Sequence, residues 1–194
     1  MEKELVLKTL KESIRVKERF LTKKNAALIT EAAVTIVESF KAGGKLMLLG
    51  NGGSAADAQH MAAELVNRFE IERPPLPAVA LTTDSSVLTS IGNDYDYGQI
   101  FSKQVKAIGV GGDVLLAIST SGNSTNVVKA VEAASKLGLK VIGLSGGDGG
   151  KLAKKTDILI NVNATSTARI QEVHITVIHI LCQLIDHILF QKVS

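Results

Sequence analysis

The chain has 194 residues, a length that suits one domain able to bury a full core without disulfides or a structural metal. Its net charge is only +3, and the basic residues are scattered, so no nucleic-acid surface is expected. The N-terminal segment is charged throughout and every long apolar stretch has polar breaks, which predicts a cytoplasmic protein without a signal peptide or membrane span.

The first forty residues have helical periodicity. Apolar residues recur at turn-like spacing over residues 3–40, with a break near residues 22–24 and a stop at residues 42–44. This pattern predicts two N-terminal helices within residues 1–41. We expect these helices to contribute to contacts between copies of the chain.

From residue 45 onward, short apolar runs alternate with helical segments. Strands are predicted at residues 45–49, 78–81, 113–118, 140–144 and 158–162, and helices at residues 54–69, 124–137 and 167–190. The strand runs are continuously apolar, as in a parallel sheet that helices cover on both faces. The predicted fold is a single α/β domain over residues 1–194: a three-layer, doubly wound, five-stranded parallel sheet within residues 45–190, plus the N-terminal helical segment.

The last predicted helix is apolar on nearly every side. Such a helix is buried, and at the end of a domain its partner is expected to include another subunit, which predicts a homo-oligomer. Cys182 is expected to be a buried small hydrophobe. His174, His179 and Glu172 interrupt the apolar surface, and a satisfied structural role is the default expectation for each. His187 is expected to be exposed.

A glycine-rich turn at residues 50–54 follows the first strand. Glycines let a backbone approach a ligand closely, and Ser54 is suited to cap the next helix. A tight connection would use the same residues, although ligand contact is favoured. The turn lacks the Lys-Ser/Thr pair of a Walker loop and the third glycine of a dinucleotide fingerprint.

A serine-rich turn at residues 119–124 follows the third strand. Hydroxyls and helix-start amides together form a cradle for a phosphate dianion without any Lys or Arg. Four hydroxyls exceed what a helix cap needs, so phosphate binding is favoured over capping by Ser124 alone. Since ligands gather at the carboxyl ends of parallel strands, the two turns predict one pocket for a small phosphorylated molecule.

His60 and Glu64 are four residues apart on the helix that follows the glycine-rich turn. This spacing places both side chains on one face, where they could bind a metal or act as acid and base. Spacing alone favours an ordinary surface pair. Their position beside the turn makes a functional role equally plausible.

Four segments together resemble the sugar isomerase (SIS) domain family. They are GNGGSAADAQHMAAELVNRF at residues 50–69, GNDY at residues 92–95, STSGNS at residues 119–124 and ARIQEVHITVIH at residues 168–179. The resemblance covers nearly the whole chain. It is strongest to members that convert sedoheptulose 7-phosphate to D-glycero-D-manno-heptose 7-phosphate, the first step toward the ADP-heptose of lipopolysaccharide. It implies an aldose–ketose isomerase that acts as a homotetramer, with active sites at subunit interfaces.

The resemblance also implies residue roles. Glu64 matches the base that moves a proton between C1 and C2 through an enediol, and His179 matches its acid/base partner. The implied ligands of one zinc ion per subunit are His60, Glu64, Gln171 and His179. The implied substrate-binding residues are Asn51, Gly52, Gly53, Asn93, Asp94, Ser119, Thr120, Ser121, Ser124 and Gln171. Gln171 and His179 are about 12 Å apart along a regular helix, so sharing one zinc requires them to lean together or an irregular helix start.

Two other functions fit part of the pattern. A non-enzymatic member of the family that binds the bacterial replication initiator shares the scaffold and the NRFE-ERP-LPA pattern of residues 67–78. That relative lacks, in the family pattern, the Glu found here at position 64, so Glu64 and the two intact turns favour an active isomerase. The second alternative is a regulatory module that binds a sugar phosphate without turnover.

Overall fold

A parallel sheet forms the centre of the molecule. In the computed structural model, which describes residues 1–191, five strands lie in the order β2-β1-β3-β4-β5 and are all parallel. They are β1 (Leu46–Leu49), β2 (Ala78–Ala80), β3 (Val114–Ser119), β4 (Lys140–Gly146) and β5 (Ile158–Val162). The predicted strands match these bounds within two residues, and the predicted fold class is confirmed.

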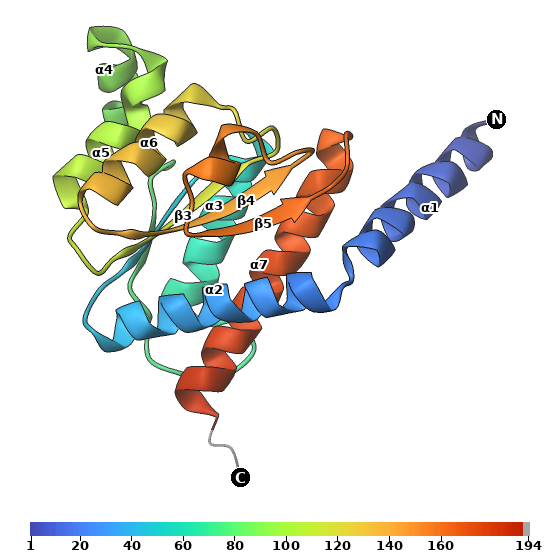
Figure 1. Ribbon diagram of the computed structural model, residues 1–194, viewed down its shortest axis with the longest axis horizontal. Coiled ribbons are helices and arrows are strands. Elements are labelled where there is room, and N and C mark those ends of the chain that lie inside the picture. Colours follow the sequence, from blue (N-terminus) through green and yellow to red (C-terminus); the bar gives the residue numbers. More distant parts are fainter. Residues whose placement is uncertain (192–194) are drawn as a thin grey trace.

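Helices cover both faces of this sheet (Figure 1). One face carries α2 (Lys23–Lys41), α3 (Gly53–Val66) and α7 (Thr167–Phe190), and the other carries α5 (Ile100–Ile108) and α6 (Thr125–Lys136). Side chains alternate between the faces, so Leu46 and Leu48 enter the first core while Met47 and Leu49 enter the second. The result is the predicted three-layer arrangement.

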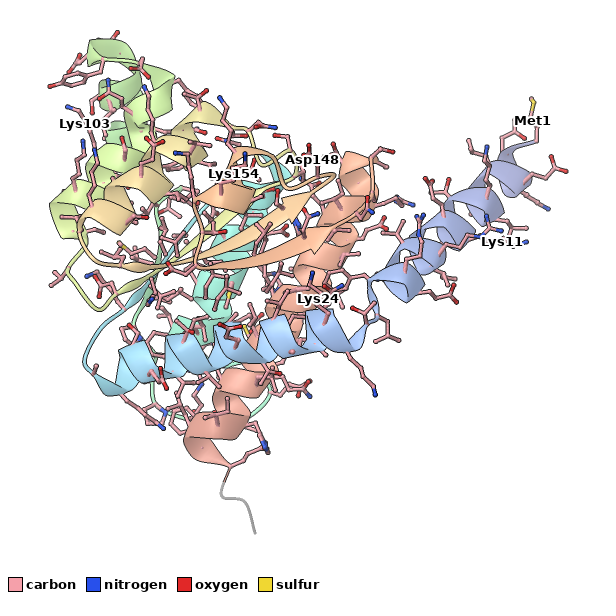
Figure 2. All side chains as sticks on the ribbon, viewed as in Figure 1. Met1, Lys11, Lys24, Lys103, Asp148 and Lys154 are labelled. Atoms are coloured by element: carbon pink, nitrogen blue, oxygen red, sulfur yellow. The ribbon has the colours of Figure 1, made fainter. Side chains whose placement is uncertain are left out.

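The N-terminal segment forms two separate helices, as predicted. The first, α1 (Glu2–Phe20), is followed by Thr22, whose hydroxyl accepts a hydrogen bond from the backbone N–H of Asn25 and so caps α2. Figure 1 shows α1 projecting from the body, and Figure 2 labels Met1 and Lys11 along it. Several of its apolar side chains, including Leu7, Leu10 and Ile14, are more than half exposed, whereas Val16 is buried.

The segment between β2 and β3 contains helices that the sequence did not predict. These are α4 (Ser85–Asp94), the short η1 (Tyr97–Gln99) and α5. The α4 residues include Ser, Thr, Gly and Asn, which are weak helix formers, and none of them is buried. A second short helix, η2 (Gly150–Lys154), follows β4. Figure 2 labels Lys103 of α5, whose Nζ lies 3.0 Å from the centroid of the Tyr95 ring.

Two predictions about α3 were wrong. The helix ends at Val66 and not near residue 69, because the Arg73 side chain takes up carbonyl groups at its end. Ser54 does not cap it either. The N-cap is Gly52, with φ +56°, and no side chain bonds the free amides at this helix start.

The last helix, α7, is a core helix. By length and composition it alone among the described residues could cross a membrane, which the sequence analysis did not anticipate. It packs against α2, α3 and β4, and it buries His174 and the charged Asp186. Cys182 is buried and His187 is exposed, as predicted.

Candidate active site

The site lies where the strand order changes direction. From β1 the chain moves one way to β2, and β3 to β5 follow on the other side, so β1 and β3 flank a topological switch point. Ligands bind at the carboxyl ends of the strands at such points. The glycine-rich turn leaves β1 and the serine-rich turn leaves β3 at this edge.

A reciprocal amide pair joins the two turns. Asn51 Nδ2 donates to Asn126 Oδ1 at 2.9 Å, and Asn126 Nδ2 donates to Asn51 Oδ1 at 2.8 Å. Asn126, in the first turn of α6, is 3 % exposed, so Asn51 is bonded to a buried side chain. The Tyr97 hydroxyl also reaches Asn51 Oδ1, at 3.3 Å. Asn126 and Tyr97 were missed in the sequence, where neither lies in a recognisable motif position.

The serine-rich turn presents several neutral hydrogen-bonding groups. The Ser119 hydroxyl donates to the Ser124 hydroxyl at 3.1 Å, and Ser121 Oγ accepts from the Asn123 N–H at 3.2 Å. Ser124 is the N-cap residue of α6, but its side chain makes no capping hydrogen bond. Gly122 has φ +64°, and a Cβ there would overlap the carbonyl of Gly149. Ser121 is exposed and Thr120 half-buried, so hydroxyls remain accessible beside the helix start.

The glycine-rich turn supplies space. A Cβ placed on Gly53 would lie 2.6 Å from Nε2 of Gln171, so the Gln171 side chain on α7 packs directly on this backbone. Gln171 is half-buried. Thus Gly52, Gly53 and Gln171, three predicted substrate-binding residues, meet at the start of α3.

A cluster of titratable side chains joins α3 to α7. His60 Nε2 lies 3.3 Å from Glu64 Oε1 and 3.0 Å from His179 Nε2. The His179 ring also stacks on Phe69, with centroids 5.8 Å apart. The His60 and Glu64 side chains are 43 % and 26 % exposed, so the group opens to the surface of a single chain. The spacing argument therefore placed His60 and Glu64 correctly, and His179 joins them from another helix.

Asp57 is a further member of this cluster that the sequence analysis missed. Burial raises the pKa of its carboxyl, while the nearby His60 and His179 act in the opposite direction. Its Oδ2 atom is buried and has no hydrogen-bond partner within residues 1–191. Asp57 lies three residues before His60, one helical turn away, and that spacing was the available signal.

Some predicted site residues make no hydrogen bond to the other predicted site groups within residues 1–191. Asn93 and Asp94 are at the end of α4, where Asn93 Nδ2 donates to Asp94 Oδ1 at 2.9 Å and both are exposed. Among the described residues, Gln171 makes no hydrogen bond to His60, Glu64 or His179. By contrast, His174 has the structural role expected by default: its Nε2 lies 3.0 Å from the carbonyl oxygen of Ser145.

The doubly wound parallel sheet and the match to a family model together identify an SIS domain. The SIS domain model matches residues 10–146. The phosphoheptose isomerase of Thermodesulfovibrio yellowstonii is 55 % identical, over 96 % of this chain and 92 % of that one.

Solved structures agree with the sequence relatives. The phosphoheptose isomerase of Neisseria gonorrhoeae is 48 % identical with a TM-score of 0.88, and that of Francisella tularensis is 42 % identical with a TM-score of 0.93. Each alignment covers 96 % of this chain and 99 % of the other. The chain belongs to the phosphoheptose isomerase family of SIS-domain proteins, and it is an aldose–ketose isomerase. The non-catalytic alternatives are not favoured.

Proposed function

We propose that this enzyme converts sedoheptulose 7-phosphate to D-glycero-D-manno-heptose 7-phosphate, the entry step to ADP-heptose and the lipopolysaccharide core. The observation that carries the proposal is the meeting of Glu64, His60 and His179 on two helices beside the switch point of the sheet. Relatives named phosphoheptose isomerase, matched over almost the whole chain, support the choice of substrate.

The residues suit a proton transfer through an enediol. The Glu64 carboxylate takes a proton from C1 of the ketose and returns it to C2. His179 moves a proton from the C1 hydroxyl to the C2 carbonyl oxygen, so the aldehyde forms at C1 and a hydroxyl at C2. The serine-rich turn, with Ser119, Thr120, Ser121 and Ser124, holds the phosphate, while Asn51, Gly52, Gly53, Asn93, Asp94 and Gln171 contact the sugar.

We also propose one zinc ion per subunit. Two imidazole nitrogens and a carboxylate oxygen are donors that zinc accepts, and their separations of 3.0 and 3.3 Å resemble the roughly 3.3 Å between ligands of a tetrahedral zinc. Within the described part of the chain, no group of three or more His, Cys, Asp or Glu side chains is already arranged to hold a metal ion, so these side chains would have to move to bind zinc. His60, Glu64 and His179 would hold the ion, with Gln171 as a fourth donor, and bound zinc would polarise the substrate carbonyl.

A homotetramer completes the proposal. A cavity of about 500 Å³ lies between the end of α1, α2 and α7, and apolar side chains such as Ile29, Val177 and Leu184 line it. The exposed apolar side of α1 and this cavity would both be covered by other copies of the chain. Copies would also shield the open Glu64 and His60 from water. We expect a cytoplasmic location, where phosphorylated sugars are made.

The test is incubation with sedoheptulose 7-phosphate in D₂O, with added zinc or with a chelator, followed by NMR of the products. An active isomerase forms the aldose and places deuterium at C2, and the chelator should slow this reaction. If the substrate binds and neither aldose nor deuterium appears, the chain is a binding module and the proposal fails. Light scattering of the purified protein tests the tetramer separately.

A further inference from the structure

A buried ion pair lies beside the acid/base cluster and has no part in the chemistry above. Arg73 and Asp186 are 1 % and 5 % exposed, and Arg73 Nε donates to Asp186 Oδ1 at 2.9 Å. The same guanidinium donates to the backbone carbonyls of Glu64 at 2.8 Å and Leu65 at 2.7 Å. A weaker bond reaches the carbonyl of Asn67 at 3.2 Å.

These bonds cap the C-terminal end of α3. The last carbonyls of a helix have no partner within it, and that end carries a partial negative charge. The planar fork of an Arg bonds several of them at once, which a Lys ammonium cannot reproduce. Arg73 therefore defines where α3 ends.

The same side chain ties α3 to α7. Asp186 follows His179 by seven residues, two helical turns, so the two side chains lie on the same side of α7. On α3, the Glu64 residue whose backbone Arg73 holds is the one whose side chain is the proposed base. Burial raises the pKa of the Cys182 thiol to about 12, and the charges of Glu64, Asp186 and Arg73 also affect this pKa, so the thiol lies in the same neighbourhood.

An ion pair is a costly way merely to join two helices. Asp186 Oδ2 is buried without a hydrogen-bond partner in the described residues, and well-packed apolar side chains often stabilise such a contact equally well. Unlike apolar contacts, the hydrogen bonds of the pair are directional, and they fix both the rotation and the register of α3 against α7. Small displacements of reacting groups lower rates strongly.

We propose that Arg73 and Asp186 are positioning residues that set the placement of Glu64 relative to His179. The inference rests on the proposed isomerase function. Their effect should appear in the chemical step more than in substrate binding, because neither residue is in contact with the two turns that hold the sugar phosphate.

The experiment compares Arg73→Lys and Asp186→Asn with Asp113→Asn in the full-length enzyme. Asp113 is 4 % exposed, much like Asp186, and it pairs with the more exposed Lys45, 2.6 Å away, at the amino end of the sheet. We expect kcat to fall at least tenfold in the first two variants with KM within twofold of wild type. The control should lose thermal stability by a similar amount and keep its kcat.

A double variant, Arg73→Met with Asp186→Leu, separates positioning from folding. Apolar replacement of the whole pair should recover part of the melting temperature lost in Asp186→Asn, although Met cannot bond the α3 carbonyls, while kcat stays at least tenfold low. Wild-type kcat in the folded double variant, or in Arg73→Lys, would overturn the inference. If the wild-type enzyme itself shows no turnover, the proposed function fails and the positioning role fails with it, whereas wild-type kcat in the variants overturns the positioning role alone.

Discussion

The two turns at the switch point have the same place in the fold and opposite chemistry. Each follows a central strand and begins a helix, yet residues 50–54 offer bare backbone and residues 119–124 offer hydroxyls. The glycine-rich turn leaves space that Gln171 fills, whereas the serine-rich turn carries accessible donors beside a helix start. In the proposed function, the glycine-rich turn would shape the space for the reacting end of the sugar, and the serine-rich turn would bind its charged end.

Both turns are supported from behind by the same helix. Gln171 on α7 packs on Gly53, and three residues later His174 contacts the carbonyl of Ser145. The Ser145 hydroxyl in turn donates to the carbonyl of Ser119, at 3.2 Å. Helix α7 thus packs against the glycine-rich turn, supports the serine-rich turn through Ser145, and contributes His179 to the cluster with His60 and Glu64. Variants at each contact can show whether the turns act separately.

The largest expected effect is at the base. Glu64→Gln keeps the size of the side chain but removes the carboxylate, so kcat should fall about 10³-fold, while the phosphate turn still binds substrate. Steady-state kinetics and a binding titration with sedoheptulose 7-phosphate measure the two effects. Glu132→Gln, an exposed change on α6, is the matched control. Unchanged kcat in Glu64→Gln would remove Glu64 from this role.

The acid/base helix was largely predictable from residue spacing, whereas its partner His179 could be found only through the family resemblance. Spacing placed His60 and Glu64 on one face, because four residues is one helical turn wherever the helix lies. His179 is far away in the sequence, and only the packing of α7 against α3 brings its ring to His60. Likewise, the contact of Arg73 with α3 depends on the path of the loop after that helix, which local patterns do not encode.

The second-largest expected effect is a pH dependence of stability that comes from His174, the α7 residue that contacts Ser145. Burial lowers the pKa of His174 to about 4, despite its hydrogen bond to Ser145, so the folded protein keeps this ring neutral. An unfolded chain binds the proton below about pH 6.5. The contribution of His174 to the free energy of unfolding is thus complete above pH 6.5. It is lost as the pH falls toward 4, by about 1.4 kcal/mol per pH unit and about 3 kcal/mol in all.

Urea unfolding from pH 7 to pH 4.5 measures this loss, and NMR of the His174 ring reports its protonation directly. We expect the ring to remain neutral at pH 5 in the folded protein. If it titrates near pH 6.5, as an exposed imidazole does, then His174 is not the buried link between α7 and the serine-rich turn.

The third effect tests the space beside the glycine-rich turn. In Gly53→Ala the new methyl would meet Gln171, whose flexible end would move aside. Displacement of the Gln171 side chain from its position beside Gly53 should lower kcat/KM between about tenfold and 10²-fold. Gly111→Ala, where the nearest atom is the Leu137 carbonyl oxygen at 3.4 Å, is the control. Wild-type kinetics in Gly53→Ala would show that the space itself is not used.

The edges of the site were the hardest part to predict. Helix α4 has no buried residue and only a short apolar pattern at Leu88 and Ile91, and Asn93 and Asp94 could be found only by resemblance. Asn126 is buried and pairs with Asn51 on the glycine-rich turn, 75 residues away in the sequence. The strands, in contrast, were predictable because burial on both faces makes each one a continuous apolar run.

The smallest expected effect comes from Ser121→Ala, which tests the serine-rich turn separately from the glycine-rich turn. Ser121→Ala removes one exposed donor, so KM for sedoheptulose 7-phosphate should rise about tenfold with little change in kcat. Binding of unphosphorylated sedoheptulose should be unaffected, since it lacks the dianion. Ser135→Ala, which deletes a hydroxyl bonded within the far end of α6, controls for general loss of a side chain. Equal weakening of both sugars would place the phosphate elsewhere, and the division of tasks between the two turns would be wrong.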